Sequence, residues 1–174
     1  MRHRAPGPPD LGPVLPACIH EVNTWVWLGE VSERAGRRLT LAEVPASEWD
    51  ALVPDGVDCV WLMGVWERSP AGRAVALGDD GLRRSWDEAL PGWTEDDVLG
   101  SPYSVRDYVC ADDLGGREGL AAARTALADR GARLIVDLVP NHVAPDHPLV
   151  TSRPDAFIIG SAEDLSQDPT GFLE

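Results

Sequence analysis

Three short apolar runs along the chain alternate with segments whose apolar residues recur at helical spacing. The runs cover residues 22–28, 57–63 and 134–139 and are rich in Val, Trp, Leu and Ile, which is typical of strands covered on both faces. Helical spacing appears over 47–53 and 119–130. The alternation predicts an α/β fold with a parallel sheet, either an open doubly wound sheet or the beginning of a (β/α) barrel.

Between the second strand and the second helix lies a long segment without helical spacing. Residues 64–113 are rich in Gly, Asp and Arg and are predicted to form a loop. Long loops inside a domain are usually functional or disordered. In parallel α/β folds the loops that leave the carboxyl ends of the strands build the binding site, so this loop is expected to contribute to one.

The net charge and the composition indicate a folded domain that is not expected to bind nucleic acid. The 174 residues include 15 basic and 29 acidic residues, and the net charge is −14. All the basic residues are arginines. Such acidity gives no electrostatic footprint for a phosphate backbone, so no nucleic-acid partner is expected. With 44% hydrophobic residues, the chain can bury a sizeable core.

The cysteines and the absence of a signal-peptide pattern indicate the cellular compartment that we expect for the protein. Cys18, Cys59 and Cys110 are odd in number and form no C-x-x-C pair, which favours reduced thiols in a cytoplasmic protein. The proline-rich residues 1–18 lack the apolar run of a signal peptide and are predicted to be a mobile lead-in. The chain has no apolar stretch of about 18 residues, so no membrane partner is expected.

The third apolar run ends in a cluster of polar residues. Asp137 lies inside that run, and burying its carboxylate costs several kcal/mol unless it is hydrogen-bonded or paired. Asn141 and His142 follow Pro140, which holds the exit from the strand rigid. By itself the D-x-x-x-N-H pattern also fits a strand-end Asp with a partner and two loop residues.

Four segments in the same order and spacing resemble the α-amylase family of glycoside hydrolases. They are Asn23-Thr24-Trp25-Val26-Trp27-Leu28, Gly56-Val57-Asp58-Cys59-Val60-Trp61-Leu62-Met63, Gly100-Ser101-Pro102-Tyr103-Ser104-Val105-Arg106-Asp107-Tyr108 with Asp113-Leu114-Gly115-Gly116, and Gly131-Ala132-Arg133-Leu134-Ile135-Val136-Asp137-Leu138-Val139-Pro140-Asn141-His142. The resemblance runs from about Glu21 to Val143. It implies an incomplete (β/α)8 TIM barrel comprising the first three βα units.

The resemblance also implies roles for individual residues. Tyr103 would stack on the sugar beside the scissile bond, because a pyranose presents an apolar face to an aromatic plane. His142 would hydrogen-bond the same sugar, and Asp137 would support the floor of the site. Asn141 would supply an oxygen ligand to a structural calcium. Asp107 would pair with a cationic side chain near the substrate.

The catalytic residues of the family are expected outside this sequence. Retaining glycosidases need two carboxylates, and the family places its nucleophilic Asp at the fourth strand and its acid Glu at the fifth. We therefore expect an N-terminal part of an enzyme that hydrolyses or transfers α-glucosidic units, inactive alone. The predicted organisation is a lead-in at 1–18, barrel at 19–150 and the start of an insertion at 151–174.

Seven of the eleven aromatic residues are tryptophans. Trp25, Trp27 and Trp61 fall in the predicted strands and Trp49 falls on the apolar helix face, so all four are expected in the core. Trp66, Trp86 and Trp93 fall in the predicted loop. Trp66 follows the second strand closely and is expected to line the cleft and bind substrate, which would be an α-glucan or α-glucoside.

Two alternatives remain open at this point. The first is a non-catalytic carbohydrate-binding module derived from the barrel, which should melt cooperatively and bind a maltooligosaccharide. The second is a metal-dependent hydrolase built around His142, Asp146 and His147, whose residue types suit zinc or manganese.

Overall fold

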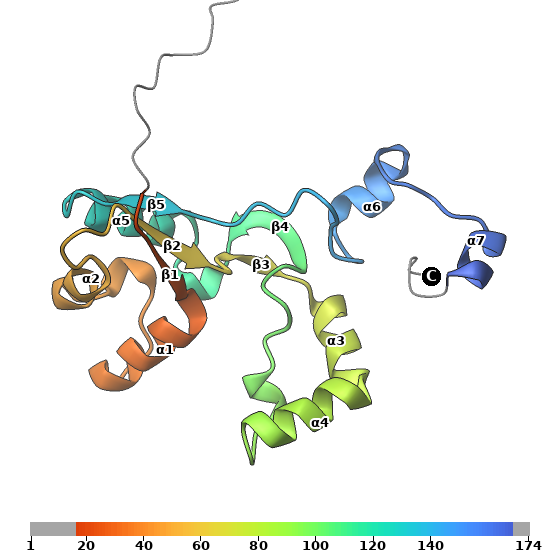
Figure 1. Ribbon diagram of the computed structural model, residues 1–174, viewed down its shortest axis with the longest axis horizontal. Helices are drawn as coiled ribbons and strands as arrows, with labels where there is room; N and C mark the ends of the chain where they lie inside the picture. Colours follow the sequence, from red (N-terminus) through yellow and green to blue (C-terminus); the bar gives the residue numbers. More distant parts are fainter. Residues whose placement is uncertain (1–16, 169–174) are drawn as a thin grey trace, which may run out of the picture.

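A three-stranded parallel sheet forms the centre of the computed structural model, which describes residues 17–168. Strands β1 (Ile19–Asn23), β2 (Cys59–Met63) and β5 (Arg133–Ile135) lie in the order β1-β2-β5 (Figure 1). Glu21 is level with Trp61, and Trp61 is level with Ile135. The predicted mixed α/β fold with a parallel sheet is confirmed, and its interpretation as an incomplete (β/α)8 barrel of three βα units stays a prediction.

Three helices supply the apolar residues that cover one face of this sheet. They are α1 (Thr24–Ala35), α2 (Ala46–Leu52) and α5 (Gly116–Ala128). Val60 and Leu62 of β2 are fully buried in one cluster with residues such as Val31, Trp49 and Leu127 of the helices. The predicted helices 47–53 and 119–130 are confirmed within a few residues.

The opposite face of the sheet is largely open. Side chains alternate between the two faces of a strand, so Ile19, Glu21 and Asn23 share the face of Trp61 and Ile135. Ile19, Glu21 and Asn23 are exposed, and Trp61 and Ile135 are half-buried. This face therefore presents both apolar and polar side chains that the described residues do not bury.

The prediction of a strand over residues 22–28 is wrong beyond Asn23. The Asn23 side chain accepts a hydrogen bond from the backbone N–H of Val26 (3.4 Å) and caps α1, a role in which asparagine is strongly preferred. Thr24, Leu28 and Val31 are the buried residues of that helix and share one helical face. Trp25 and Trp27 accordingly belong to a helix.

The predicted long loop at 64–113 is also wrong, because it contains regular structure. Strands β3 (Trp66–Arg68) and β4 (Val105–Cys110) form an antiparallel pair. Between them lie α3 (Pro70–Gly78), α4 (Asp80–Ala89) and the 3-10 helix η2 (Glu95–Asp97), and η3 (Asp112–Leu114) follows β4. In Figure 1, α3 and α4 form an arm that extends away from the β3–β4 pair.

Local capping explains why α3 and α4 form. Ser69 is buried, and its hydroxyl accepts from Gly72 N (2.7 Å) at the start of α3. Pro70 occupies the first helical turn, where its missing N–H has no cost. The Asp79 carboxylate accepts from Leu82 N (2.8 Å) and starts α4.

The predicted third strand, 134–139, is only partly formed. Strand β5 ends at Ile135, so Asp137 follows the strand rather than lying inside it. The chain continues through the short helices α6 (Pro148–Ser152), η4 (Pro154–Ala156) and α7 (Ala162–Gln167). The predicted domain bounds stay predictions, and residues 1–16 of the predicted lead-in lie outside the described residues.

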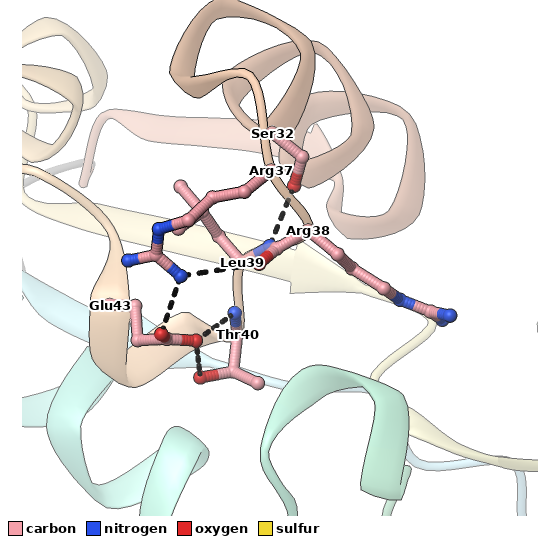
Figure 2. Close-up of polar contacts among 6 residues, drawn as sticks. All are labelled: Ser32, Arg37, Arg38, Leu39, Thr40 and Glu43. Atoms are coloured by element: carbon pink, nitrogen blue, oxygen red, sulfur yellow. Dashed lines mark hydrogen bonds and ion pairs between the residues drawn. The ribbon is translucent and has the colours of Figure 1, made fainter.

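A polar network closes the turn between α1 and the 3-10 helix η1 (Leu41–Glu43) (Figure 2). Gly36 ends α1 with a φ of 66°, a conformation that glycine adopts without strain. Arg37 Nη1 donates to Glu43 Oε1 (2.7 Å), and the other carboxylate oxygen accepts from Thr40 N and Oγ1 (both 2.9 Å). The Ser32 hydroxyl accepts from Leu39 N (3.1 Å).

Among residues 17–168, no helix combines the length and apolarity needed to cross a bilayer.

Candidate functional site

The carboxylate of Asp137 lies at the carboxyl edge of the parallel sheet, where the site was expected. It is 7% exposed. Oδ1 accepts from Trp61 Nε1 (2.9 Å), and Oδ2 accepts from Gly64 N (2.6 Å). The predicted partners of this buried charge are thus hydrogen-bond donors from β2 and the residue that follows it, and they hold the end of β5 against β2.

Trp66 supports the same strand end from outside the sheet. Its Nε1 donates to the Asp137 carbonyl oxygen (2.8 Å). The indole is half-buried and packs edge-on against the Tyr108 ring, with centroids 5.5 Å apart. These contacts show a structural role for Trp66, and its contact with substrate stays a prediction.

Arg68 joins this edge of the sheet to the loop that precedes β4. Its Nη1 donates to the Gly100 carbonyl oxygen (2.8 Å), and its guanidinium lies 5.1 Å from the centre of the Trp25 ring. Burial lowers the pKa of Arg68, and the nearby charge of Asp137 acts in the opposite direction. The Nε atom is buried without a hydrogen-bond partner in the described residues. Arginine nevertheless remains charged at neutral pH.

Two residues expected to bind sugar lie together above this edge. His142 Nε2 is 3.2 Å from the carbonyl oxygen of Tyr103, and both side chains are exposed. They come from segments 39 residues apart in the sequence. Tyr108 ties the same segments together, because its hydroxyl accepts from Val139 N (2.8 Å) and donates to Val139 O (3.1 Å).

Asp107 and Asn141 form no direct hydrogen bond or ion pair with Tyr103 or His142 among the described residues. Asp107 is half-exposed on β4 and forms no ion pair with residues 17–168, while its neighbour Arg106 pairs with Glu67 (2.6 Å). Asn141 is exposed. The described residues contain no cluster of three His, Cys, Asp or Glu side chains that could hold a metal. Such a cluster does not include amide or carbonyl oxygen ligands, so calcium at Asn141 stays a prediction.

The second alternative, a metal site of His142, Asp146 and His147, is not formed among these residues. His147 is buried, and its Nδ1 accepts from Leu149 N (3.1 Å) at the start of α6. Asp146 accepts from the Ser69 hydroxyl (2.5 Å) and from Ala71 N (3.3 Å). Burial raises the pKa of Asp146. These hydrogen bonds lower it by more, so the pKa lies below its ordinary value.

Sequence reasoning missed Arg68, Gly64 and the Trp61 indole as parts of this edge. The Ser69-Pro70 pair could have indicated a helix start and so a strand before it, which would have placed Arg68 at a strand end. Nothing local links Trp61 or Gly64 to Asp137, because more than 70 residues separate them in the sequence.

Comparison with known proteins supports the fold. No protein-family model matches the chain, and no curated protein matches it either. Among solved structures, the chain is similar to an α-amylase from Lactobacillus plantarum, with 21% sequence identity and a TM-score of 0.55. The match covers 84% of this chain and 28% of that one, so the chain spans under a third of the amylase. This distant likeness supports a glycoside hydrolase-like fold.

Proposed function

We propose that this chain is the N-terminal part of an α-amylase-type retaining glycoside hydrolase or glucosyltransferase that acts on α-glucosidic bonds. The observation that carries the proposal is the contact between the His142 ring and the Tyr103 backbone carbonyl oxygen, which brings these two exposed residues together, combined with the buried Asp137 at the carboxyl edge of the sheet. An amylase-like fold combined with a ring and an imidazole at this edge suits a bound sugar.

In this proposal the residues of the chain bind and orient the substrate. The exposed Tyr103 ring provides a plane for the apolar face of a glucose unit. The imidazole of His142 provides a hydrogen-bonding group for a sugar hydroxyl. Asp137 fixes the start of the segment that follows β5, through its bonds to Trp61 and Gly64, and His142 lies further along that segment.

The open face of the sheet supports the proposal that more strands complete the domain. Ile19 is 51% exposed on an edge strand, and a barrel would cover it by closing the sheet on itself. The carboxylate pair that retaining glycosidases need is proposed to come from those further strands.

The reading frame beyond Glu174 tests this function directly. It is expected to encode a strand ending in Arg-x-Asp and then a strand bearing a Glu. The whole protein should release 4-nitrophenol from an α-glucoside, and Tyr103→Ala and His142→Ala should each lower kcat/KM. Hydrolysis by the 174-residue chain alone would contradict the proposed position of the catalytic carboxylates.

A further inference from the structure

We propose that the cavity between the first turn of α1 and helix α4 is a second sugar subsite, in which Trp86 and Trp93 contact a glucose unit of an α-glucan. This inference rests on the proposed function and adds a binding site to it. The cavity has a volume of 490 Å³ and is lined by α1, α4 and residues 97–102. That volume lies within the usual range for small-molecule sites.

The two indoles form an ordered pair of rings in this cavity. Their centroids are 5.1 Å apart and their planes meet at 74°. Trp93 Nε1 donates to Asp87 Oδ1 (2.8 Å), and the Arg83 guanidinium lies 5.3 Å from the Trp93 ring centre. The Trp86 indole is half-buried, and its N–H has no hydrogen-bond partner in residues 17–168. Trp86 can thus offer both a ring and a free donor to a ligand.

Polar side chains line the same cavity beside these rings. Asn23 uses its side-chain oxygen to cap α1, and no amide hydrogen of that side chain is bonded within the described residues. Arg68 also lines the cavity, and it forms no ion pair with residues 17–168. Rings together with hydrogen-bonding groups suit a sugar better than a purely apolar ligand.

The apolar face of α4 has no other cover in the described structure. None of the residues in α3 or α4 is buried. Leu82 and Trp86 lie one turn apart on α4, and both line the cavity. Leu82 is 42% exposed. The helix therefore presents apolar side chains to the cavity without packing them into a core.

The cavity adjoins the candidate site along the backbone. Gly100, Ser101 and Pro102 form part of its wall, and Tyr103 is the next residue. Asn23 ends β1, so the cavity also lies at the carboxyl edge of the sheet. A glucan chain held at Tyr103 could extend toward the two tryptophans. The proposed occupant of the cavity is therefore a further glucose unit of the same substrate.

Binding of maltoheptaose to the 174-residue chain tests the subsite. Indole N–H signals in NMR spectra would report which tryptophans contact the sugar, and calorimetry would give the Kd. We expect shifts of the Trp86 and Trp93 signals, and Trp86→Ala should raise the Kd about tenfold, equivalent to about 1.4 kcal/mol. Val75→Ala on the neighbouring helix α3 is the matched control, because Val75 is 65% exposed and does not line the cavity, and it should raise the Kd less than about twofold.

Three results would overturn the subsite. The first is binding that Tyr103→Ala abolishes but Trp86→Ala and Trp93→Ala leave unchanged, which would leave the proposed function intact. The second is equal weakening by Val75→Ala, which would indicate non-specific binding to exposed apolar side chains of the arm. The third is no binding of maltoheptaose at all; activity of the whole protein on an α-glucoside would then decide the proposed function separately. Circular dichroism of each variant confirms that α4 is retained.

Discussion

At the scale of single residues, Asp137 organises the carboxyl edge of the sheet. Its two oxygens accept from different donors, the Trp61 indole and the Gly64 backbone. Removing the acceptor leaves two donors unsatisfied, and each costs about 1–3 kcal/mol when it stays buried. The charge itself is tolerated because both oxygens are hydrogen-bonded.

Asp137→Ala is therefore expected to free the amide of Gly64. Its hydrogen exchange should accelerate roughly 10- to 100-fold, which corresponds to the loss of about 1.4–2.8 kcal/mol of protection. The half-exposed Asp107 forms no comparable bond, so Asp107→Asn serves as the control. Unchanged exchange at Gly64 in the Asp137 variant would show that this hydrogen bond is absent in solution.

Glu43 offers a second test at the residue scale. The hydrogen bond from Arg37, with those from Thr40 N and Oγ1, lowers the pKa of Glu43 to about 2. Because the folded-state pKa is depressed, the stability that this carboxylate contributes is present above about pH 4.3. It is lost as the pH falls from there through about 2.

Arg37→Ala should raise the pKa of Glu43 toward its ordinary range, because the largest lowering contribution is removed. NMR titration of the Glu43 carboxyl carbon measures this change. The neighbouring Arg38 pairs instead with Asp113 (3.0 Å), so Arg38→Ala should leave the Glu43 titration in place. A similar shift in both variants would point to long-range charge rather than the Arg37 contact.

At the scale of elements, the strand prediction for residues 22–28 failed beyond Asn23 because the strand preference of Trp and Val depends on context. Tertiary context overrides such propensity, and here the Asn23 cap and the buried stripe of Thr24, Leu28 and Val31 favour a helix. The same stripe recurs at helical spacing in the sequence. The error was therefore to assign a strand to a segment whose buried residues have the period of a helix. The strand predicted at 57–63 is observed as Cys59–Met63, and it was predictable because it is short, apolar and followed by a glycine.

Two glycines inside helices should respond in opposite ways to alanine. A Cβ at Gly29 of α1 would meet no atom within 4 Å, so Gly29→Ala should stabilise the chain by about 0.5–1 kcal/mol. A Cβ at Gly119 of α5 would collide with the Leu114 carbonyl oxygen, and that backbone atom cannot move freely. Gly119→Ala should therefore destabilise by about 1–3 kcal/mol.

Thermal unfolding followed by circular dichroism distinguishes the two glycine variants. At roughly 2–4 °C per kcal/mol for a chain of this size, Gly29→Ala should raise the Tm by about 1–4 °C. Gly119→Ala should lower it by several degrees. A rise in Tm for Gly119→Ala would mean that α5 does not approach Leu114 as closely as the structure shows.

At the scale of the whole molecule, the sheet is well covered on one face and largely open on the other. Ile19 on the edge strand β1 is 51% exposed, and edge strands with exposed apolar residues promote association. Additional strands would relieve this exposure in a larger domain, as proposed above. The isolated chain has no such cover among its described residues.

The isolated 174-residue chain is accordingly expected to self-associate as its concentration rises. Ile19→Arg should reduce the association measured by sedimentation velocity, because it places a charge on the open sheet face. Ile158→Arg is the matched control, since Ile158 is 95% exposed but lies outside the sheet. Equal effects of the two variants would show that association depends on general hydrophobicity rather than on this face.

The amino-acid sequence alone determined the α/β class, two of the helices, the central strand and the polar character of the third strand's end. These features depend on local patterns of period, capping and composition. Only the tertiary structure decided which donors surround Asp137 and that the His142 ring contacts the Tyr103 carbonyl oxygen. It also decided that β3 pairs with β4 across the segment predicted as a loop at 64–113. The reason is physical, because these contacts join residues tens of positions apart, and chain packing rather than local preference brings them together.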